Sequence, residues 1–371
     1  MQGRQFVGTE SRLKLLLELI NDLVQGSSED SAADWARMVA EYRAVSSEPR
    51  AKGVAVPIIF GVDAVHGHNN IPDATIFPHN IGLGAMREPQ LLHAIGRATA
   101  VEMQVTGLDW TFAPTIAVAR DDRWGRTYEG YSEDPAIVHD YAAAIVTGLQ
   151  GAADADFLGS ERVISTVKHF VGNDAEFERM TINSVIDQRT LREVYLLPFE
   201  LAVREGGSLG IMTSYNRMNG VYCAENSELL QDILRDEWGF EGFVVTDWFA
   251  GFTTEGAAHA GLDLEMPAPP RGYGKFLAEA VKEGRVDEAD LDRAVRTLLS
   301  TFDRLGALDD EPQAPMAIDL PEHRQLARRA AVSSMVLLRN EKVNDQALLP
   351  LNTNGLKSVA VIGPNAERTR I

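Results

Sequence analysis

Apolar residues follow two different spacings along this chain, and the two spacings alternate. Segments in which apolar residues recur every three to four positions predict helices near residues 11–24, 32–46, 88–106, 134–150, 189–206, 227–237, 274–284, 287–304 and 322–339. Short continuous apolar runs predict strands near residues 56–62, 108–113, 163–169, 209–215, 242–247, 261–266 and 358–363. Buried strands followed by helices are typical of a parallel sheet covered by helices. The pattern therefore predicts an α/β fold.

Charged and amide side chains stand just after the apolar runs of several predicted strands. They occur in the stretches FGVDAVHGHNN, FAPTIAVARDDRWGR, TVKHFVGND, MTSYN, VVTDW and LDLEMP. Functional side chains gather at the carboxyl ends of the strands in a (β/α)8 barrel, and an open doubly wound sheet binds ligands there too. The first strand–helix junctions lack a G-x-G-x-x-G motif, which favours the barrel. We expect a (β/α)8 TIM-like barrel that is irregular at its first strand, since no clear strand precedes Val54.

The end of the chain has a different organisation. The stretch EPQAPMAIDLP, at residues 311–321, is rich in proline and is typical of a linker. After it the sequence predicts one helix and one strand, SVAVIGPN, and a single strand cannot bury its own faces. We expect a barrel domain at residues 1–310, a linker at 311–325, and at 326–371 the start of a second domain that this chain does not complete.

The charge balance narrows the class of ligand. The 371 residues include 54 acidic and 35 basic side chains, for a net charge of −19. Such a surface repels phosphate backbones and anionic lipid headgroups, so we expect no nucleic-acid partner and no membrane partner. Neutral or cationic small ligands are favoured.

The sequence leaves the compartment open. No run approaches eighteen apolar residues, so no membrane-spanning helix is predicted. The start, MQGRQFVGTESRLKLLLELI, continues into polar residues at helical spacing, and we interpret it as an amphipathic helix and not as a signal peptide. The single cysteine, Cys223, forms no disulfide framework and does not distinguish a cytoplasmic protein from a mature secreted or periplasmic one.

An aspartate ends one of the most apolar strands. In FEGFVVTDWFA, at residues 240–250, the strand runs directly into Asp247 and Trp248. Burying a carboxylate costs several kcal/mol unless a partner compensates. A helix cap or a structural ion pair explains such an aspartate as well as a functional role does. Trp248 favours the functional interpretation, because the apolar face of a sugar packs on aromatic rings.

Other polar residues suit the binding of a polyhydroxylated ligand. Lys168 and His169 stand together at a predicted strand end, where both reach one pocket only if the strand terminates there. The stretch RDDRWGRTYEGYSEDP, at residues 120–135, is either a solvated loop of ion pairs or the source of an inward bidentate arginine, Arg126. Asp63 ends another strand with no cation nearby in the sequence.

A metal site is not predicted. His66, His68, His169 and Asp174 show neither an i, i+4 pair nor a recognised ligand spacing. We interpret His66 and His68 as hydrogen-bonding residues that lock a loop.

The motifs, taken together, resemble a known family. GVDAVHGHNN, RDDRWGRTYEGYSEDP, KHFVGND, MTSYN, VVTDW and AGLDLEMP occur in an order that is similar to that of glycoside hydrolase family 3. The resemblance runs from about Val56 to the end of the chain. It implies a barrel followed by an α/β sandwich domain, whose beginning resembles RRAAVSSMVLLRNE and VAVIGPNA. Members of the family are chiefly β-glucosidases and related β-glycosidases.

The resemblance also implies roles for individual residues. Asp247 matches the family's nucleophile, which attacks the anomeric carbon and forms a covalent glycosyl-enzyme. Asp63 matches the residue that holds the 4- and 6-hydroxyls. The remaining matches are ring-hydroxyl binders (Arg126, Lys168, His169), residues that line the same subsite (Arg179, Tyr215) and apolar walls (Met212, Trp248).

The acid/base of the family is not among these matches. The family's usual residue is a glutamate of the second domain, which the resemblance places beyond Ile371. One branch uses an Asp–His pair in a KHFPGHG-like stretch, but KHFVGNDAEFER here lacks the second histidine. If this chain supplied its own acid/base, Asp174, Glu176 and Glu178 would be the first candidates.

The resulting prediction is a retaining, exo-acting β-glucosidase that hydrolyses terminal β-D-glucosyl residues through Asp247. We expect it to act on β-glucosides or β-gluco-oligosaccharides without a cofactor, and to depend on a missing second domain or a complementing chain. β-Xylosidase or N-acetylhexosaminidase specificity remains an alternative. So does a non-catalytic sugar-binding barrel, because the acid/base domain is absent. The first half resembles an exo-glucanase branch and the second half a bacterial β-glucosidase branch, which leaves a natural intermediate or a chimera open.

Overall fold

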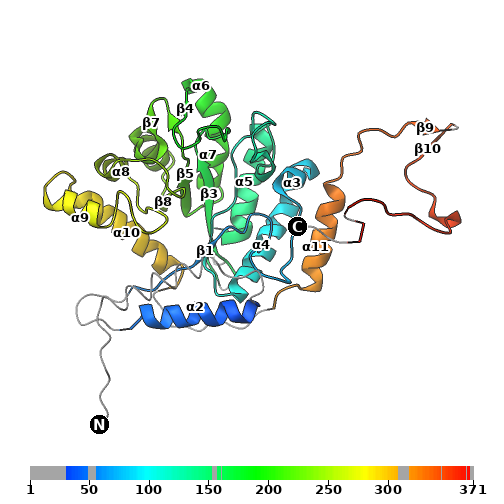
Figure 1. The fold of residues 1–371 in the computed structure, drawn as a ribbon, viewed down its shortest axis with the longest axis horizontal. Helices are drawn as coiled ribbons and strands as arrows, with labels where there is room; N and C mark the ends of the chain where they lie inside the picture. Colours follow the sequence, from blue (N-terminus) through cyan, green and yellow to red (C-terminus); the bar gives the residue numbers. More distant parts are fainter. Residues whose placement is uncertain are drawn as a thin grey trace, which may run out of the picture.

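The computed structural model describes residues 31–48, 56–152, 157–159, 161–307, 317–343, 345–364 and 366–367 (Figure 1). The predicted helix at 11–24 lies outside these residues, as does part of the proline-rich stretch. None of the helices described in these ranges is long and apolar enough to cross a membrane.

A curled parallel sheet forms the centre of the fold and confirms the α/β prediction (Figure 1). Its strands, in spatial order, are β1 (Gly61–Val62), β2 (Trp110–Thr111), β3 (Ile164–Phe170), β5 (Gly210–Thr213) and β8 (Phe243–Thr246). Every neighbouring pair is parallel, so all the carboxyl ends lie at one edge. Every residue of β5 and of β8 is buried, which accounts for their continuous apolar runs.

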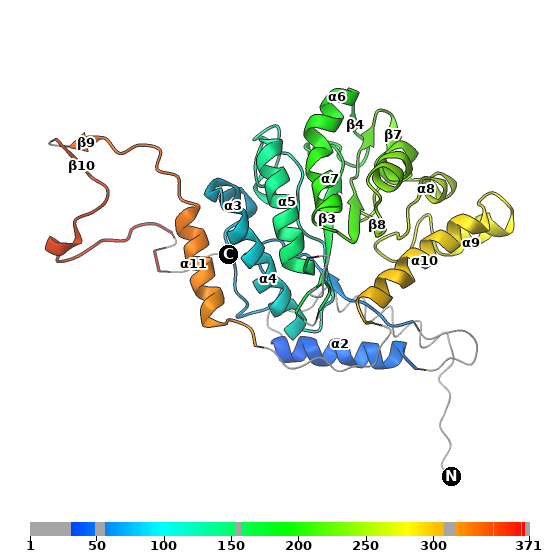
Figure 2. The ribbon, with the colours of Figure 1, turned by 180° about the vertical axis from the view of Figure 1, so that it is seen from behind.

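Helices cover the outer face of the sheet (Figure 2). The main ones are α4 (Pro89–Val105), α5 (Pro135–Gln150) and α7 (Leu197–Arg204), and α5 packs against both of the others. Asp134 caps α5 by accepting a bond from the Ala136 N–H at 2.9 Å. α4 and α5 approach closely where two glycines meet. A Cβ on Gly148 would lie 2.4 Å from the His93 oxygen, so no larger residue fits without a shift.

Two apolar clusters hold the layers together. The larger one joins the helices to the outer face of the sheet and contains Leu92, Tyr141 and Phe199. The smaller one lies among the strands and contains Trp110 and Phe243, whose rings meet edge to face with centroids 5.2 Å apart. The strand ends are therefore supported from both sides.

The remaining helices and strands complete the fold around this sheet. Their bounds are α2 (Ala32–Ser46), α3 (Asn80–Met86), η1 (Thr127–Glu129), β4 (Asn183–Ser184), α6 (Gln188–Thr190), η2 (Leu191–Tyr195), β6 (Arg217–Met218), β7 (Val221–Tyr222), η3 (Cys223–Glu225), η4 (Glu228–Glu237), α8 (Thr254–Ala260), α9 (Lys275–Lys282) and α10 (Glu288–Arg304). The small sheet β4-β6-β7 was not predicted, because two-residue strands carry no periodic signal.

The predicted strand at 261–266 is present only in part. Leu264 forms a single parallel bridge with Val245, next to β8. This segment lies next to β8 as a further parallel neighbour, but it does not form a regular ladder of hydrogen bonds.

The C-terminal segment departs from the sequence prediction. α11 (Pro321–Ser333) packs on α3 and α4, and it ends at Ser333 instead of continuing to residue 339. β9 (Lys342–Val343) and β10 (Gln346–Ala347) form a small hairpin away from the sheet (Figure 1), and η5 (Thr353–Gly355) follows. The predicted strand at 358–363 is wrong for this structure. Its residues pair with no strand among those described, and Ile362 is 92% exposed, because an apolar run forms a strand only beside a partner.

Asp263 ties three elements together beside β8. Its carboxylate accepts bonds from Arg235 of η4 at 2.7 Å, from Arg293 of α10 at 2.7 Å and from the Val244 N–H of β8 at 2.8 Å. Burial raises the pKa of Asp263, while the two arginines act in the opposite direction. The aspartate is sealed from solvent by its partners.

Replacing Asp263 by alanine should lower the free energy of unfolding by about 3–5 kcal/mol, because it leaves two largely buried guanidinium groups without their anion. Urea unfolding of the purified chain, followed by circular dichroism, measures this loss. Glu241→Ala is the matched control. It removes an exposed ion pair with Arg304 of α10 and should cost less than about 1 kcal/mol. Equal losses in the two variants would contradict the role given to Asp263.

Candidate active site

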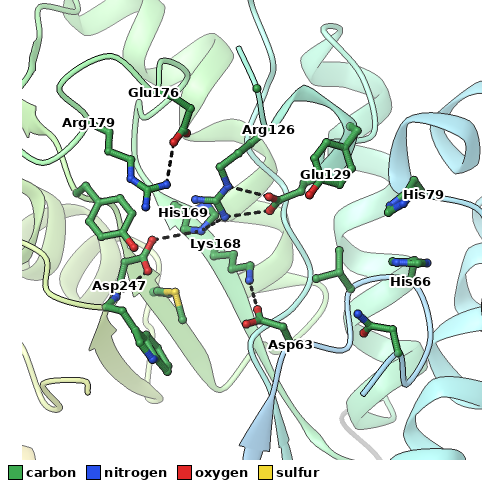
Figure 3. Close-up of a pocket in the computed structure, with 17 residues that line it drawn as sticks. Asp63, His66, His79, Arg126, Glu129, Lys168, His169, Glu176, Arg179 and Asp247 are labelled. Atoms are coloured by element: carbon green, nitrogen blue, oxygen red, sulfur yellow. Dashed lines mark hydrogen bonds and ion pairs between the residues drawn. The ribbon is translucent and has the colours of Figure 1, made fainter. Parts of the chain in front are cut away.

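A cavity of about 690 Å³ opens at the carboxyl ends of the strands (Figure 3). It brings together the nine residues to which the family resemblance gave roles: Asp63, Arg126, Lys168, His169, Arg179, Met212, Tyr215, Asp247 and Trp248. Asp63 directly follows β1, Lys168 and His169 belong to the end of β3, Met212 lies in β5, and Asp247 directly follows β8. The parallel order of the strands is what places these distant residues side by side.

Lys168 and His169 both face the cavity although they are adjacent in a strand. Strict alternation would send one of them to the opposite face. The pairing of β3 with β5 changes register between Val167 and Phe170, so the alternation ends where these two residues lie. The strand does not terminate at these residues, as the sequence analysis required, but continues to Phe170. The irregular register is what accompanies the turn of both side chains toward one cavity.

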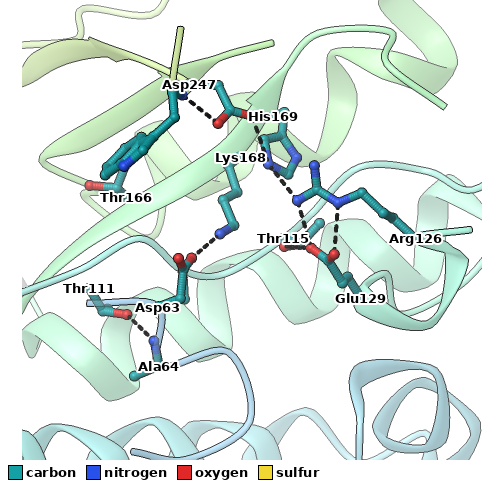
Figure 4. A network of polar contacts seen from close by, with 12 residues as sticks. Asp63, Ala64, Thr111, Thr115, Arg126, Glu129, Thr166, Lys168, His169 and Asp247 are labelled. Atoms are coloured by element: carbon teal, nitrogen blue, oxygen red, sulfur yellow. Dashed lines mark hydrogen bonds and ion pairs between the residues drawn. The ribbon is translucent and has the colours of Figure 1, made fainter. Parts of the chain in front are cut away.

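Asp63 forms an ion pair with Lys168 (Figure 4). The Lys168 ammonium donates a hydrogen bond to Asp63 Oδ1 across 105 residues of sequence. The lysine side chain is 5% exposed, whereas that of Asp63 is 59% exposed. A buried ammonium group therefore presents its charge toward the cavity, and an accessible carboxylate stands beside it. A donor and an acceptor next to each other suit neighbouring sugar hydroxyls.

Arg126 is the inward bidentate arginine considered from the sequence. Its Nε donates to Glu129 Oε1 at 2.7 Å and its Nη2 to Glu129 Oε2 at 3.0 Å. Burial acts to lower the pKa of Arg126, but Glu129 outweighs it, so the pKa lies above its ordinary value. Sequence reasoning missed Glu129. The i, i+3 spacing of the two residues was the available signal.

His169 is a neutral imidazole. Burial lowers its pKa well below the ordinary value, and the charges of Arg126, Lys168 and Arg179 lower it further. Arg126 Nη2 donates to His169 Nε2 at 3.0 Å, so the ring proton sits on Nδ1. Asp247 Oδ2 lies 3.4 Å from the same Nε2. Because both of these atoms are acceptors, that approach is a packing contact and not an ion pair.

Asp247 is a buried carboxylate at the wall of the cavity, and it is 7% exposed. Its Oδ1 accepts a bond from the Trp248 N–H at 2.7 Å. Burial raises the pKa of Asp247, and this effect is opposed by a hydrogen bond from the Tyr215 hydroxyl, by the Trp248 N–H and by the charges of Lys168 and Arg126. The carboxylate is thus partly desolvated and surrounded by groups that favour its ionised form.

Arg179 lines the cavity together with Tyr215. Its guanidinium carbon lies 4.7 Å from the centre of the Tyr215 ring. Its Nη1 donates to Glu176 Oε2 at 2.8 Å, and Trp124 Nε1 donates to Glu176 Oε1 at 2.9 Å. Both oxygens of Glu176 are therefore engaged by donors.

The three acidic residues after KHFVGN lie in different places. Glu176 lines the cavity, and Glu178 is exposed. Asp174 lines a separate small cavity with His169, where the Tyr195 hydroxyl donates to its Oδ2 at 3.2 Å. Burial raises the pKa of Asp174. Only Glu176 of this group reaches the main cavity.

His66 and His68 lock a loop, as the sequence suggested. His66 Nδ1 donates to the Phe77 oxygen at 2.9 Å, and His68 Nε2 lies 3.0 Å from Thr106 Oγ1. His66 also lines the cavity, and its ring contacts that of His79 at a tilt of 41°, with ring centroids 4.1 Å apart. Sequence reasoning missed His79, because nothing in its motif distinguishes it from a structural histidine.

The apolar part of the lining includes Met212 and Trp248. The Trp248 ring meets Phe112 edge to face, with centroids 4.8 Å apart, so its orientation is supported from behind. No group of three or more histidine, cysteine, aspartate or glutamate side chains in the described part of the chain could hold a metal ion. The arrangement can bind a neutral ligand rich in hydroxyls and bring a carboxylate to it.

Comparisons with known proteins point to one family. The profile described as "Glycosyl hydrolase family 3 N terminal domain" matches residues 17–301. A β-glucosidase of Rhizobium radiobacter is 43% identical over 296 residues, which cover 80% of this chain and 34% of that protein. A probable β-glucosidase I of Aspergillus niger is 40% identical over 326 residues, which cover 87% of this chain and 38% of that protein.

A solved structure agrees with these matches. The exo-1,3/1,4-β-glucanase ExoP of a Pseudoalteromonas species superposes with a TM-score of 0.78 and 38% identity, over 85% of this chain and 42% of that one. The chain thus spans little more than a third of the length of the curated relatives that it matches. It belongs to glycoside hydrolase family 3, through the amino-terminal domain of that family.

Proposed function

We propose that this chain carries the sugar-binding site and the nucleophile of a retaining, exo-acting β-glucosidase. The observation that carries the proposal is the pairing, in one cavity, of a buried carboxylate, Asp247, with a set of charged hydrogen-bonding groups at the neighbouring strand ends. The names of the matched relatives support the same substrate class, terminal β-D-glucosyl residues of β-glucosides or β-gluco-oligosaccharides.

In the proposed reaction, a carboxylate oxygen of Asp247 attacks the anomeric carbon as the bond to the aglycone breaks. The product of this step is a covalent glycosyl-enzyme, which water then hydrolyses. The transition state resembles an oxocarbenium ion, so a nearby carboxylate stabilises the charge that develops on the ring. The Tyr215 hydroxyl, which acts to lower the pKa of Asp247 in the same cavity, orients the attacking carboxylate.

The other groups hold the sugar ring. Lys168 and Arg126 donate to ring hydroxyls, and Asp63 accepts from the 4- and 6-hydroxyls beside the Lys168 ammonium. His169 presents a fixed neutral ring, because Arg126 occupies its Nε2. Met212 and Trp248 pack on the apolar faces of the sugar. Hydroxyl contacts that strengthen as the ring distorts contribute to the rate as well as to binding.

The proton donor is proposed to lie outside residues 1–371. Glu176 is the one acidic residue of its loop that lines the cavity, yet Arg179 and Trp124 already engage both of its oxygens. A carboxylate whose two oxygens both accept hydrogen bonds has no oxygen left to face a leaving alcohol. A non-catalytic sugar-binding barrel would share this property, and the covalent test below distinguishes the two.

We also propose that the chain forms a TIM-like barrel at residues 1–310, a linker at 311–325 and the start of an α/β sandwich domain at 326–371. The parallel strand order and the strand-end cavity support the barrel. The exposed apolar side chains that follow α11, such as Leu338 and Ile362, are typical of a surface that contacts another protein surface.

Incubation of the purified chain with 2,4-dinitrophenyl 2-deoxy-2-fluoro-β-D-glucoside should attach one fluoroglucosyl group to Asp247. The dinitrophenolate leaves without a proton, and the fluorine slows breakdown of the intermediate, so the adduct persists. Peptide mass spectrometry locates the label. Asp247→Asn should remove it, whereas Asp174→Asn should retain it. A label on another carboxylate would refute the assignment, and reversible binding without any label would favour the sugar-binding barrel.

Asp63→Ala should weaken the binding of a glucoside by about 1.5–3 kcal/mol, which corresponds to a hydrogen bond with a charged group. A xyloside lacks the 6-hydroxymethyl group and should lose less. The apparent affinities of 2-fluoro glucosides and xylosides, taken from their rates of inactivation, measure the difference. Equal losses for both sugars would show that Asp63 does not contact the 6-hydroxyl.

Asp247→Asn should raise Tm at pH 7. Because burial raises the folded-state pKa of Asp247, the neutral form contributes stability that is fully present below the ordinary pKa of 3.8 and is lost as the pH rises through the folded pKa. Asparagine stays neutral at every pH, so its advantage should be largest near neutrality and should vanish below pH 3.8. Thermal unfolding across this range checks the trend. A Tm difference that does not change with pH would contradict it.

A further inference from the structure

One buried carboxylate joins the wall of the cavity to helix α11. Glu102 of α4 is 1% exposed. On one side, its Oε2 accepts a bond from the Thr75 N–H at 2.7 Å, and its Oε1 accepts one from the Thr75 hydroxyl at 2.7 Å. Both bonds anchor the loop of residues 66–77, here called the pocket loop.

On its other side, Glu102 holds α11. His323 Nδ1 donates to Glu102 Oε1 at 2.8 Å, and the Asp319 N–H donates to the same oxygen at 3.2 Å. Burial acts to raise the pKa of Glu102, but the bonds from His323 and Thr75 outweigh it, so the pKa lies below its ordinary value. A buried anion depends on every donor that it has, because losing one leaves charge without compensation.

Contacts within the pocket loop connect Thr75 to the wall of the cavity. Thr75 is followed by Ile76, which forms an antiparallel bridge with Gly67, and by Phe77, whose N–H donates to the His66 oxygen at 2.8 Å. The His66 ring returns a bond to the Phe77 oxygen at 2.9 Å. Since His66 lines the cavity, the chain of contacts runs from α11 through Glu102 and Thr75 to the cavity wall.

A second set of contacts holds α11 and does not involve Glu102 or the pocket loop. Glu88 accepts bonds from Arg329 at 2.6 Å and from Ser333 at 3.0 Å, both in the C-terminal half of the helix. These partners belong to α11 alone, and in the described part of the chain the Glu88 side chain has no bond to the pocket loop. The two ends of α11 are therefore held by carboxylates of which only one also holds the cavity wall.

We propose that Glu102 is a positioning residue for the cavity, through which the docking of α11 orders the pocket loop and sets the His66 wall. Docking of the helix and binding in the cavity then favour one another. That the bound ligand is a sugar rests on the function proposed above, whereas the coupling between helix and loop does not.

Amide hydrogen exchange tests the coupling without any ligand. His323→Leu removes the donor from α11, and we expect about tenfold faster exchange at the Phe77 amide, since one hydrogen bond to a charged group is lost. Glu88→Gln loosens the same helix at its other end and should speed exchange in α11 while leaving the pocket loop unchanged. Equal effects of the two variants on the pocket loop, or none from His323→Leu, would overturn the proposal.

A double-variant cycle tests whether the coupling passes through the shared carboxylate. Thr75→Val removes only the hydroxyl bond to Glu102 and keeps the volume of the side chain. His323→Leu should then speed exchange of the pocket loop by a smaller factor in the Thr75→Val background than alone, because the path is already weakened. If His323→Leu speeds exchange of the pocket loop by the same factor in both backgrounds, the coupling does not pass through Glu102.

Inactivation by the fluoroglucoside separates positioning from chemistry. His323→Leu should raise the concentration needed for half-maximal inactivation several-fold and leave the limiting rate unchanged, as expected for a lost binding contact. A fall in the limiting rate alone would contradict a positioning role. If the chain is not inactivated at all, the proposed function fails, and the exchange measurements still decide the coupling.

Discussion

The requirement to pair a buried ammonium group organises this site. Lys168 is 4% exposed at the end of the central strand of the sheet, and a lone charge there would cost several kcal/mol. Asp63 supplies the counter-charge from the end of β1, two strands away in the sheet. The pair is possible because the strands are parallel and end at the same edge. The same geometry gathers Arg126 and Asp247 into the cavity, where each charge influences the protonation of the others.

Burial alone does not distinguish the functional carboxylate from a structural one. Burial raises the pKa of both Asp247 and Asp263. Asp263 is enclosed by two arginines and a backbone N–H, and it meets no cavity described here. Asp247 faces an open cavity of about 690 Å³ with only a few donors around it. Access to a ligand, together with incomplete compensation, is what makes Asp247 the candidate for chemistry.

The cavity is not independent of the segment that follows the sheet. α11 lies against α3 and α4, and Glu102 connects it to the loop that carries His66 (Figure 2). After α11 the chain runs away from the sheet and its helices, and several of its apolar side chains are exposed. In the function proposed above, this part of the protein binds and attacks the sugar, and a group outside residues 1–371 provides the proton.

The sequence by itself determined the α/β class, the position of most helices and the polar residues at the strand ends, because periodicity and local apolar runs are properties of neighbouring residues. Motif order pointed to the family. Only the tertiary structure decided that Lys168 pairs with Asp63 and that His323 meets Glu102, 221 residues away, because such contacts depend on how the strands and helices pack. The failed strand at 358–363 has the same cause. An apolar run shows only that its residues favour the extended conformation. A strand forms when a neighbouring strand also provides hydrogen-bond partners for its backbone N–H and C=O groups.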